Sequence, residues 1–595
     1  MGGAGGSSER LGVARHDSEP LGRSMKKSGR IRPIWVWIGV ILAVLVIAGA
    51  VVGALVAKNV IRVGSNSNSG TSSDSASGSS ATNGADPGSS SGSSSGSGGA
   101  AATATSTKPG PPKPTSCSTS GSIPSSAKGT ITDPTSWLDM ADFNCTFTAE
   151  TVGDLPIVGL NSTWDDSARA NPNVPALNKG WGSYSSRPIR GVSIGGWLSL
   201  EPFITPSLFD YDFSLGISDE YSLCAHLGPK EAAATLEKHY STFITESDFK
   251  RIADAGLDHV RIPFSYWAVR AYEGDPYVPG VSWRYLLRAI EWARRYGLRV
   301  KLDLHGLPGS QNGWNHSGRQ GTVGWLLGPD GKLNGQRSLD IHDQLSKFFA
   351  QDRYKNVVAF YGLGNEPAQS IPQADLIAWT TKAYELVRGN GVEAIQVFSE
   401  ALRGLDAWSG KLTGYGDKLA IDMHEYTIFD NNLIQLKHAA RVSFACDTFT
   451  AQIAASINTG FGPTMVGEWS QADTDCTRYL NGVGNGARWN GSFSGTIGSP
   501  KCPTLDKRCD CSAANADPSK FDDGYKVFLQ TWAEAQMDAF EAGWGWFYWT
   551  WRTESAPLWS YEAGLDGKFM PSTAYKRDWG CSKSVPSFGD LPEYY

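Results

Sequence analysis

Short apolar runs recur along the chain from position 189 onward, with longer mixed segments between them. Each run has four to six residues, and such short runs, rich in β-branched or aromatic side chains, are typical of buried strands. We therefore predict eight strands, at residues 189–194, 259–264, 299–304, 357–361, 394–398, 419–423, 463–466 and 544–549.

The segments between these strands contain the periodicity of amphipathic helices. In residues 283–296 the apolar side chains fall on one face at a period of 3.6, and Gly297 stands where a helix C-cap is wanted. Further helices are predicted at 246–255, 374–388 and 444–457. Eight strands alternating with helices favour an α/β fold, a (β/α)8 TIM barrel at residues 185–595. A doubly wound sheet is the alternative, but it rarely has eight such units.

The N-terminal region differs. Residues 34–57 are uncharged and long enough to cross a bilayer as a helix, and more basic residues precede them than follow. We predict a single-pass type II signal-anchor, with residues 1–33 as a cytoplasmic tail. A cleaved signal peptide is the alternative, but the apolar run is too long for one. Residues 58–130, rich in Ser and Gly, are predicted to be a disordered extracellular stalk, and residues 131–184 an N-terminal extension that packs on the barrel.

Charge and cysteine content narrow the possibilities. The net charge is −6 and the charged residues are spread out, so nothing indicates a nucleic-acid partner. All nine cysteines follow the apolar segment, where an oxidising compartment favours disulfides, and an odd number leaves at least one unpaired. A zinc site at the 502–511 cluster is the alternative, but its spacing matches no common zinc motif. Four N-glycosylation sequons also follow the segment: Asn144, Asn161, Asn315 and Asn490.

Polar and aromatic side chains follow nearly every predicted strand, and in an α/β barrel all these strand ends face one mouth. Two of them are glutamates 102 positions apart, Glu366 and Glu468. One protonated and one ionised carboxyl group are what hydrolysis of a glycosidic bond requires. The sequence therefore predicts a glycoside hydrolase. The other strand-end residues are Glu201, Arg261, His305, Asn365, His424, Tyr426 and Trp549.

Several ordered motifs of the chain resemble one family, the fungal exo-β-1,3-glucanases, which are glucan 1,3-β-glucosidases of glycoside hydrolase family 5. The anchor and stalk resemble those of its membrane-bound branch. The motifs are Arg190-Gly191-Val192 with Gly196-Trp197-Leu198, His259-Val260-Arg261-Ile262-Pro263, Pro308-Gly309-Ser310-Gln311-Asn312-Gly313, Gly364-Asn365-Glu366-Pro367, Gly467-Glu468-Trp469 and Tyr479-Leu480-Asn481-Gly482.

The resemblance implies that Glu366 is the acid/base and Glu468 the nucleophile of a retaining double displacement. Asn365 is then expected to bind the sugar 2-hydroxyl, and Glu366 to have a pKa raised by the second carboxylate. Arg261 and Tyr426 are expected to hold Glu468 ionised. The remaining predicted substrate-binding residues are Glu201, His305, His424 and Trp549. A metal site at the histidines is the alternative, but no ligand-spacing pattern accompanies them, and we expect neither metal nor cofactor.

The chain departs from the family after Asn312-Gly313, where Trp314-Asn315-His316-Ser317-Gly318 replaces the usual Phe-Asp-Asn-Ser-Gly. Trp314 and Phe429 are expected to form an aromatic entrance, and Asn315 stands where the family has a carboxylate that contacts the terminal glucose. The resemblance also implies two disulfides, Cys476–Cys502 and Cys446–Cys581.

The leading hypothesis is a monomeric, membrane-anchored enzyme that removes glucose from the non-reducing ends of wall β-1,3-glucan. Another β-glucoside, such as β-1,6-glucan or a glycolipid, is an alternative substrate suggested by the change to Asn315. A non-catalytic wall-glucan-binding barrel is the alternative from a different class of protein.

Overall fold

The computed structural model describes residues 125, 150–158 and 163–594, all of which belong to one compact unit, Thr107–Tyr595. The predicted cytoplasmic tail and membrane-spanning segment lie outside the described residues, as does the predicted stalk apart from residue 125. Among the described helices, none combines the length and apolar character needed to cross a membrane.

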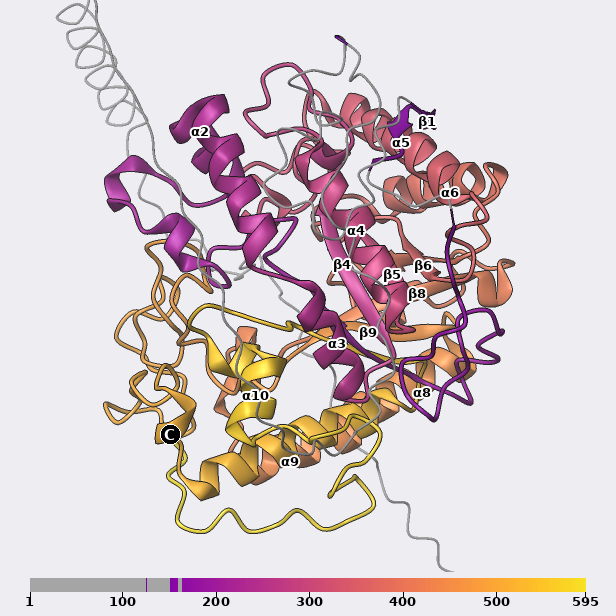
Figure 1. The fold of residues 1–595 in the computed structure, drawn as a ribbon. Helices are drawn as coiled ribbons and strands as arrows, with labels where there is room; N and C mark the ends of the chain where they lie inside the picture. The colour runs from indigo at the N-terminus through magenta and orange to yellow at the C-terminus, as the bar shows by residue number, and fades with distance from the viewer. Residues whose placement is uncertain (1–124, 126–149, 159–162, 595) are drawn as a thin grey trace, which may run out of the picture. The chain divides into compact units, whose positions relative to one another are not determined.

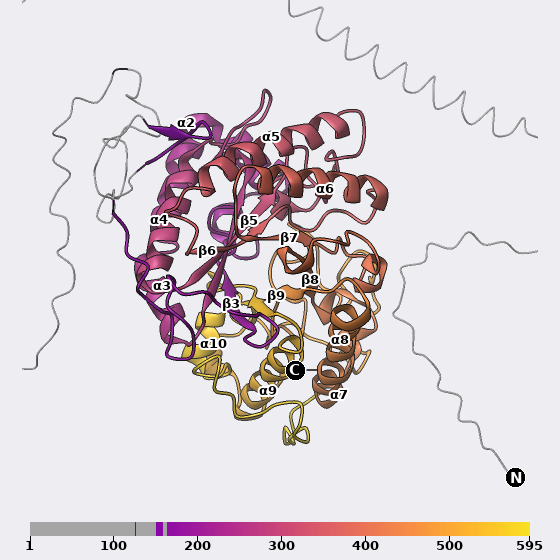
Figure 2. The ribbon, with the colours of Figure 1, turned by 90° about the vertical axis from the view of Figure 1, so that its right-hand side faces the viewer.

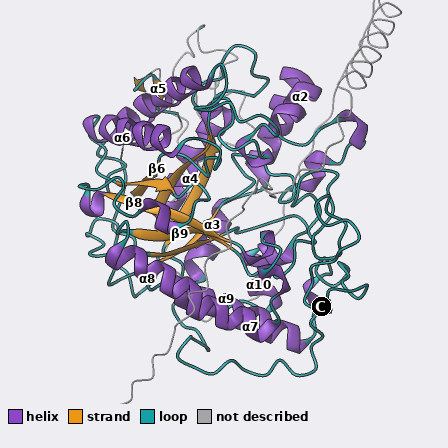
Figure 3. Cartoon of the chain, turned by 180° about the vertical axis from the view of Figure 1, so that it is seen from behind, coloured by secondary structure: helices purple, strands orange, loops and turns teal. Residues whose placement is uncertain are grey.

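Eight parallel strands close into a barrel, in the order β10-β3-β4-β5-β6-β7-β8-β9 (Figures 1 and 3). All eight coincide with predicted strands, and their ends differ by a few residues. Figure 2 shows the helices as a ring around them. The strands are β3 (Ile189–Ser193), β4 (His259–Ser265), β5 (Arg299–Gly306), β6 (Val358–Gly362), β7 (Ile395–Ser399), β8 (Leu419–Glu425), β9 (Thr464–Trp469) and β10 (Gly545–Tyr548).

The described helices are α2 (Glu220–Thr242), α3 (Glu246–Asp254), α4 (Val281–Arg295), α5 (Gly331–Phe349), α6 (Gln373–Gly389), α7 (His438–Phe444), α8 (Thr450–Thr459), α9 (Asp523–Phe540) and α10 (Tyr561–Gly567). The predicted apolar face of α4 is buried, and Gly297 beyond it has φ +70°. The segment predicted as a helix at 444–457 begins earlier, at His438, and a π-helical turn at Ala445–Phe449 links α7 to α8. Between β7 and β8 the described chain makes only short 3-10 turns.

Side chains alternate along the barrel strands between its interior and the surrounding helices. In β5, Val300 and Leu302 pack in the core shared with the helices, whereas Lys301 forms an ion pair across the barrel with Asp422 of β8. Asp303 likewise pairs with Arg261 of β4. The barrel interior below the mouth is therefore filled by paired charges as well as by apolar side chains.

The N-terminal end of the barrel is covered by aromatic side chains that precede β3. Trp181 stacks on Tyr184 at 5.5 Å, and Tyr184 stacks on Trp544 at 5.4 Å. The Tyr184 hydroxyl lies 3.3 Å from Nε2 of His259. These contacts close the end of the barrel opposite the predicted site, and Asp166 adds an ion pair with Arg294 of α4.

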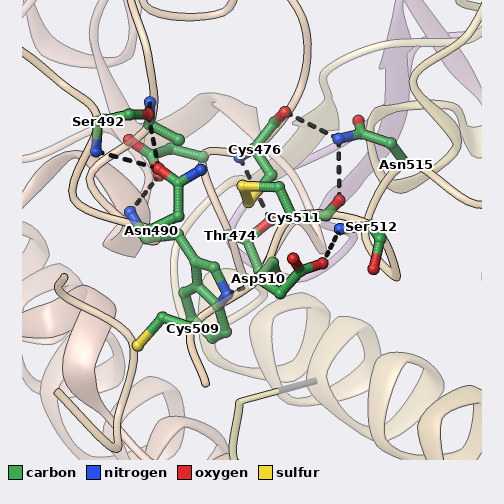
Figure 4. The surroundings of a disulfide bond; sticks show 12 residues. Thr474, Cys476, Asn490, Ser492, Cys509, Asp510, Cys511, Ser512 and Asn515 are labelled. Atoms are coloured by element: carbon green, nitrogen blue, oxygen red, sulfur yellow. Dashed lines mark hydrogen bonds between the residues drawn. A yellow bond between two sulfur atoms is a disulfide. The ribbon is translucent and has the colours of Figure 1, made fainter. Parts of the chain in front are cut away.

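One of the two expected disulfides is present, and the prediction of the other is wrong. Cys446 and Cys581 are joined as expected. Cys476 instead pairs with Cys511 (Figure 4), and Cys502 pairs with Cys509. Two turns, each closed by a backbone hydrogen bond from Leu505 to Cys502 or from Cys509 to Asp506, bring Cys509 back to Cys502. Asn515 fixes this arrangement by donating hydrogen bonds to the carbonyl oxygens of both Cys476 and Cys511, at 2.9 and 3.1 Å.

The odd cysteine among the described residues is Cys224, which is reduced and buried in α2. Of the four sequons, Asn490 is exposed and Asn315 is buried, while Asn144 and Asn161 lie outside the described residues. A buried asparagine is a poor glycan acceptor, which agrees with the place of Asn315 near the predicted site.

Candidate active site

The two glutamates come together at the C-terminal end of the barrel although they are far apart in the sequence. Glu468 lies within β9, and Glu366 follows β6 by four residues. One carboxylate oxygen of each, together with a ring nitrogen of His424, lie within 4.8 Å of one another. Glu366 has φ +43°, a conformation that costs about 1–3 kcal/mol for a residue with a side chain and is enriched at functional sites.

Two donors hold the carboxylate of Glu468. Nη1 of Arg261 donates to Oε1 at 2.6 Å, and the hydroxyl of Tyr426 donates to Oε2 at 3.0 Å. Burial alone lowers the pKa of Arg261, but Asp303, Glu468 and Asp422 raise it above its ordinary value, so the guanidinium keeps its charge. A fixed positive charge and a hydroxyl donor stabilise the ionised form of Glu468. The geometry expected for Arg261 and Tyr426 is therefore present.

Histidines surround Glu366. Nδ1 of His424 lies 2.6 Å from its Oε1 and 3.4 Å from Oε2 of Glu468. Nε2 of His316 lies 3.4 Å from the other oxygen of Glu366, Oε2. Burial alone lowers the pKa of His424, but the charges of Glu468 and Glu366 raise it well above 6.5. His424 therefore carries a proton between the two carboxylates.

The expected rise in the pKa of Glu366 is not what the structure shows. Burial by itself raises this pKa, but the charge and hydrogen bond of His424, together with His316 and His305, lower it to about 2. The imidazolium of His424, which lies between the two carboxylates, outweighs the effect of burial. The proton of the Glu366–His424 hydrogen bond therefore resides on the histidine.

Several further predicted residues form one network around this pair. Nη2 of Arg261 donates to Oδ1 of Asn365 at 2.7 Å, and Nδ2 of Asn365 lies 3.3 Å from Nε2 of His305. The ring of His305 stacks on Trp549 with centroids 5.6 Å apart and an interplanar angle of 8°. Asn365 is thereby fixed beside Glu366.

Glu201 stands apart from this network. Its Oε2 is buried and has no hydrogen-bond partner among the described residues. Burial, with the charges of Glu468 and Glu366, raises the pKa of Glu201 well above 4.5. An unpaired buried carboxyl group next to two catalytic candidates is suited to a ligand with hydroxyl groups.

The predicted entrance residues lie at the rim. Trp314 is 45% exposed and Phe429 is 39% exposed, whereas Trp549 deeper in the site is 4% exposed. The ring of Phe429 packs against Tyr426 at 5.6 Å. Asn315 is buried in the 3-10 turn after Trp314, where its carbonyl oxygen accepts from the backbone of Gly318.

Sequence reasoning missed residues that support the site from below and beside it. Gln311 donates to the carbonyl oxygens of His305 and Asn365, at 2.7 and 2.8 Å, and so ties two loops together. Asp303 accepts from Arg261 and lies 2.8 Å from Nδ1 of His305. The alternation of charged and apolar residues in β5 was the signal for Asp303 and Lys301. No comparable feature of the sequence marks Gln311 as a residue that joins the end of β5 to the loop after β6.

Glu366, His424 and Glu468 could in principle offer three metal ligands. In the structure these groups are arranged around a proton. A metal would have to displace that proton, which the raised pKa of His424 holds there. Both carboxylates already have charged donors at 2.6 Å. The arrangement suits proton transfer and nucleophilic attack.

Gly467, the residue before Glu468, has no room for a side chain. A Cβ placed there would clash with both carboxylate oxygens of Asp422, which the Lys301 ion pair holds in place. We expect Gly467→Ala to destabilise the fold by about 1–3 kcal/mol and to displace Glu468. Urea unfolding measures the first effect, and an activity assay measures the second.

Gly389→Ala is the control, because nothing lies within 4 Å of a Cβ at that helical position. Unfolding midpoints of Gly467→Ala and wild type that coincide would contradict the steric argument.

The barrel and its site define a class of protein. Residues 227–485 match the family model described as Cellulase (glycosyl hydrolase family 5), and this stretch contains β4 to β9 with both glutamates. Residues 227–485 of the eight-stranded parallel barrel are thus similar to a glycosyl hydrolase family 5 domain.

Its relatives are more specific. The chain is 58% identical over 501 residues to the "Probable glucan 1,3-beta-glucosidase D" of Aspergillus clavatus, covering 83% of this chain and 60% of the relative. The protein of the same name from Aspergillus fumigatus is 59% identical over 480 residues, covering 80% of this chain and 57% of the relative. The chain thus spans about three fifths of the length of these relatives. Among solved structures, a rutinosidase from Aspergillus niger has a TM-score of 0.49 and 19% identity, over 65% of this chain and 98% of that one.

Proposed function

We propose that this protein is a retaining glycoside hydrolase that removes glucose from the non-reducing ends of β-1,3-glucan, with Glu366 as acid/base and Glu468 as nucleophile. The separation of the two carboxylates carries the proposal. Retaining enzymes place them about 5–5.5 Å apart, and inverting enzymes about 6.5–9.5 Å apart, to admit a water molecule. Oxygens within 4.8 Å of one another favour direct attack by Glu468.

In the first step, Glu468 attacks the anomeric carbon while Glu366 protonates the leaving oxygen. Arg261 and Tyr426 keep the attacking carboxylate ionised and oriented through their bonds to its two oxygens. The proton shared with His424 reaches Glu366 along the 2.6 Å hydrogen bond between them. The departing sugar takes that proton, and a glycosyl ester forms on Glu468.

In the second step, Glu366 is ionised and acts as general base on a water molecule. His424 gave up its proton in the first step, and the ester has removed the negative charge of Glu468 that favoured a proton there, so His424 is neutral. Water attacks the anomeric carbon, its proton passes to Glu366, and the ester bond breaks to restore the carboxylate of Glu468. The proton then returns from Glu366 to His424 along their hydrogen bond. Two inversions return the β-configuration.

The substrate is inferred from the relatives and from the residues that line the mouth. The curated relatives are named as glucan 1,3-beta-glucosidases. The unpaired Oε2 of Glu201 suits the hydroxyls of a terminal glucose, and Trp549, which His305 backs, suits stacking on its ring. The exposed rings of Trp314 and Phe429 suit the next glucose. Asn365 is placed to bind the 2-hydroxyl, a bond that strengthens in the transition state.

The decisive experiment follows hydrolysis of β-1,3- and β-1,6-linked gluco-oligosaccharides by proton NMR. We expect β-glucose as the first product from the β-1,3 series, before mutarotation. An initial α-glucose signal would overturn retention, and internal cleavage products would overturn the exo mode. Faster cleavage of β-1,6 linkages would favour the alternative substrate suggested by Asn315, and binding without cleavage would favour a non-catalytic role.

The role of His424 predicts a change in pH dependence. Because the pKa of His424 is raised, its proton is retained at neutral pH and lost only as pH rises through that raised value. In His424→Gln the proton is held by Glu366 alone, so we expect the basic limb of the kcat/KM profile to move to lower pH. We expect kcat to fall about 10²-fold at the optimum.

Exposed His226 in α2 provides the control, and His226→Gln should reproduce the wild-type profile. A His424→Gln profile superimposable on the wild type would show that His424 does not hold the proton.

We also propose that residues 34–57 anchor the protein in the cell membrane, with the barrel outside as a monomer facing the wall. The uncharged segment and the excess of basic residues before it support this orientation. Release of the full chain from membranes by alkaline carbonate, without detergent, would contradict it.

A further inference from the structure

His316 occupies a fixed position at the edge of the site. It lies in the 3-10 turn Asn315–Ser317 after β5. The hydroxyl of Ser317 donates to the carbonyl oxygen of Trp314 at 2.7 Å and lies 2.7 Å from the hydroxyl of Ser310. These bonds hold the turn, and the side chain of His316 is 14% exposed. Its ring is therefore placed by the fold.

The two oxygens of Glu366 face different histidines. Oε1 is bound by His424, and Oε2 lies 3.4 Å from Nε2 of His316. This distance is long for a hydrogen bond and typical of a catalytic contact that tightens when substrate is bound. The two rings come from separate elements, β8 and the turn after β5.

The second ring nitrogen of His316 has nothing to bind. Nδ1 is buried and lacks a hydrogen-bond partner among the described residues. Buried polar atoms are rarely left unpaired in native proteins, and such an atom in a site indicates a missing partner. A polar group that enters the site can supply this partner.

The surroundings keep this ring neutral. Burial lowers the pKa of His316 to about 4, and the charges of His305, His424 and Arg261 act in the same direction, against Glu366. A neutral imidazole has one donor and one acceptor nitrogen. With Nε2–H directed at Glu366, the lone pair of Nδ1 can accept a hydroxyl proton.

The ring of His316 also lies next to the rim of the site. Its neighbours are His305 at 5.3 Å and Trp314 at 5.5 Å between ring centroids. Trp314 is half exposed at the rim, whereas Trp549, which stacks on His305, is buried. His316 thus contacts both the interior of the site and the ring proposed above to bind the second glucose.

We propose that His316 binds the leaving sugar, with Nε2–H donating to Oε2 of Glu366 and Nδ1 accepting a hydroxyl of the sugar next to the scissile bond. This inference rests on the proposed function. It makes His316 a specificity residue for β-glucosides whose leaving group is itself a sugar. At position 316, where this chain has histidine, the family that the chain resembles usually has asparagine.

The test compares two substrates that differ in the leaving group. The leaving group of laminaribiose is a glucose with its hydroxyls, and that of 4-nitrophenyl β-glucoside is a phenol that lacks them. In His316→Gln the side-chain amide reaches the position of Nε2 and leaves that of Nδ1 empty. In His316→Asn the amide lies at the position of Nδ1. His316→Phe keeps the ring and removes both nitrogens. The ratio of kcat/KM for the two substrates is independent of how much enzyme is folded.

We expect His316→Gln and His316→Phe to lower kcat/KM for laminaribiose about tenfold, and that for the aryl glucoside less than about twofold. His316→Asn should recover most of the loss on laminaribiose. An unchanged ratio in His316→Gln, or an asparagine variant no better than phenylalanine, would overturn the inference. If the wild type cleaves neither substrate, the proposed function fails. If the wild type cleaves both but prefers another glucoside linkage to β-1,3, the comparison of the His316 variants still tests this inference.

Discussion

Replacing Glu468 by alanine should lower kcat/KM for β-glucosides by about 10⁴- to 10⁶-fold, the range seen when a nucleophile is removed. Arg261 and Tyr426 both bind this carboxylate, and Asp303, the other anion that Arg261 binds, is itself held by that pairing and by His305. The small cavity left behind should admit azide. With 2,4-dinitrophenyl β-glucoside as substrate, azide attacks from the face that Glu468 occupied, and the product should be α-glucosyl azide.

The anomeric configuration of the azide product identifies the role of Glu468, and NMR measures that configuration directly. Glu385→Ala, in which an exposed glutamate of α6 is removed, should behave as wild type. Residual hydrolysis at more than about a tenth of the wild-type rate in Glu468→Ala would remove the nucleophile assignment. A β-glucosyl azide from this variant would assign Glu468 the other role.

Replacing Glu366 by alanine should affect substrates according to their leaving group. For laminaribiose, which needs a proton on the departing oxygen, kcat/KM should fall about 10²- to 10⁴-fold. For 2,4-dinitrophenyl β-glucoside the first step needs no acid, so the glycosyl ester should form quickly and then accumulate. Pre-steady-state kinetics should show a burst of dinitrophenol, and KM should fall.

Azide should relieve the slow second step of Glu366→Ala by replacing the activated water, and the product should be β-glucosyl azide. Opposite anomers from the two alanine variants would assign the two roles independently of any rate. An equal loss on both substrates in Glu366→Ala would show that Glu366 does not act as the acid. The same Glu385→Ala variant serves as the control.

The environments of the two carboxylates support the different roles proposed for them. Glu468 is held by a guanidinium and a phenol hydroxyl, groups that do not give up protons near neutral pH. Glu366 is bound by His424 and lies 3.4 Å from His316, and imidazole is the side chain whose proton moves in this range. Two chemically identical groups thus have neighbours that suit them to different functions.

The charged groups beneath the mouth connect this chemistry to the fold. Asp303 binds both Arg261 and His305, and Asp422 binds Lys301 and lies 3.7 Å from Nε2 of His424. Each buried anion is thus shared between a strand cation and a histidine of the site. Such pairs are costly to bury unless their geometry is satisfied, so they restrict how the barrel strands can align.

The eight strands and the pairing of the two glutamates were predictable from sequence. Barrel strands are buried on both faces, so each reads as an apolar run, and parallel strands bring their C-terminal residues to one end. The same geometry explains why Arg261, Asn365, His424 and Tyr426 were found. The pattern of α4 was readable because its apolar side chains recur at the helical period, although the structure also buries polar residues of this helix, such as Arg284.

What the sequence could not determine depends on distances between side chains of different loops. Cys502, Cys509 and Cys511 all follow Cys476 within 35 positions of the sequence. Only the path of the inserted loop decides that Cys511 is the partner of Cys476. The lowered pKa of Glu366 arises from His424, 58 positions away, whose ring nitrogen lies 2.6 Å from it. His316 was one histidine among several until the fold set its Nε2 beside Glu366 and left its Nδ1 unpaired. The pattern of apolar residues specifies the barrel because burial depends on local periodicity, whereas proton positions, disulfide partners and ligand contacts depend on distances that tertiary packing alone sets.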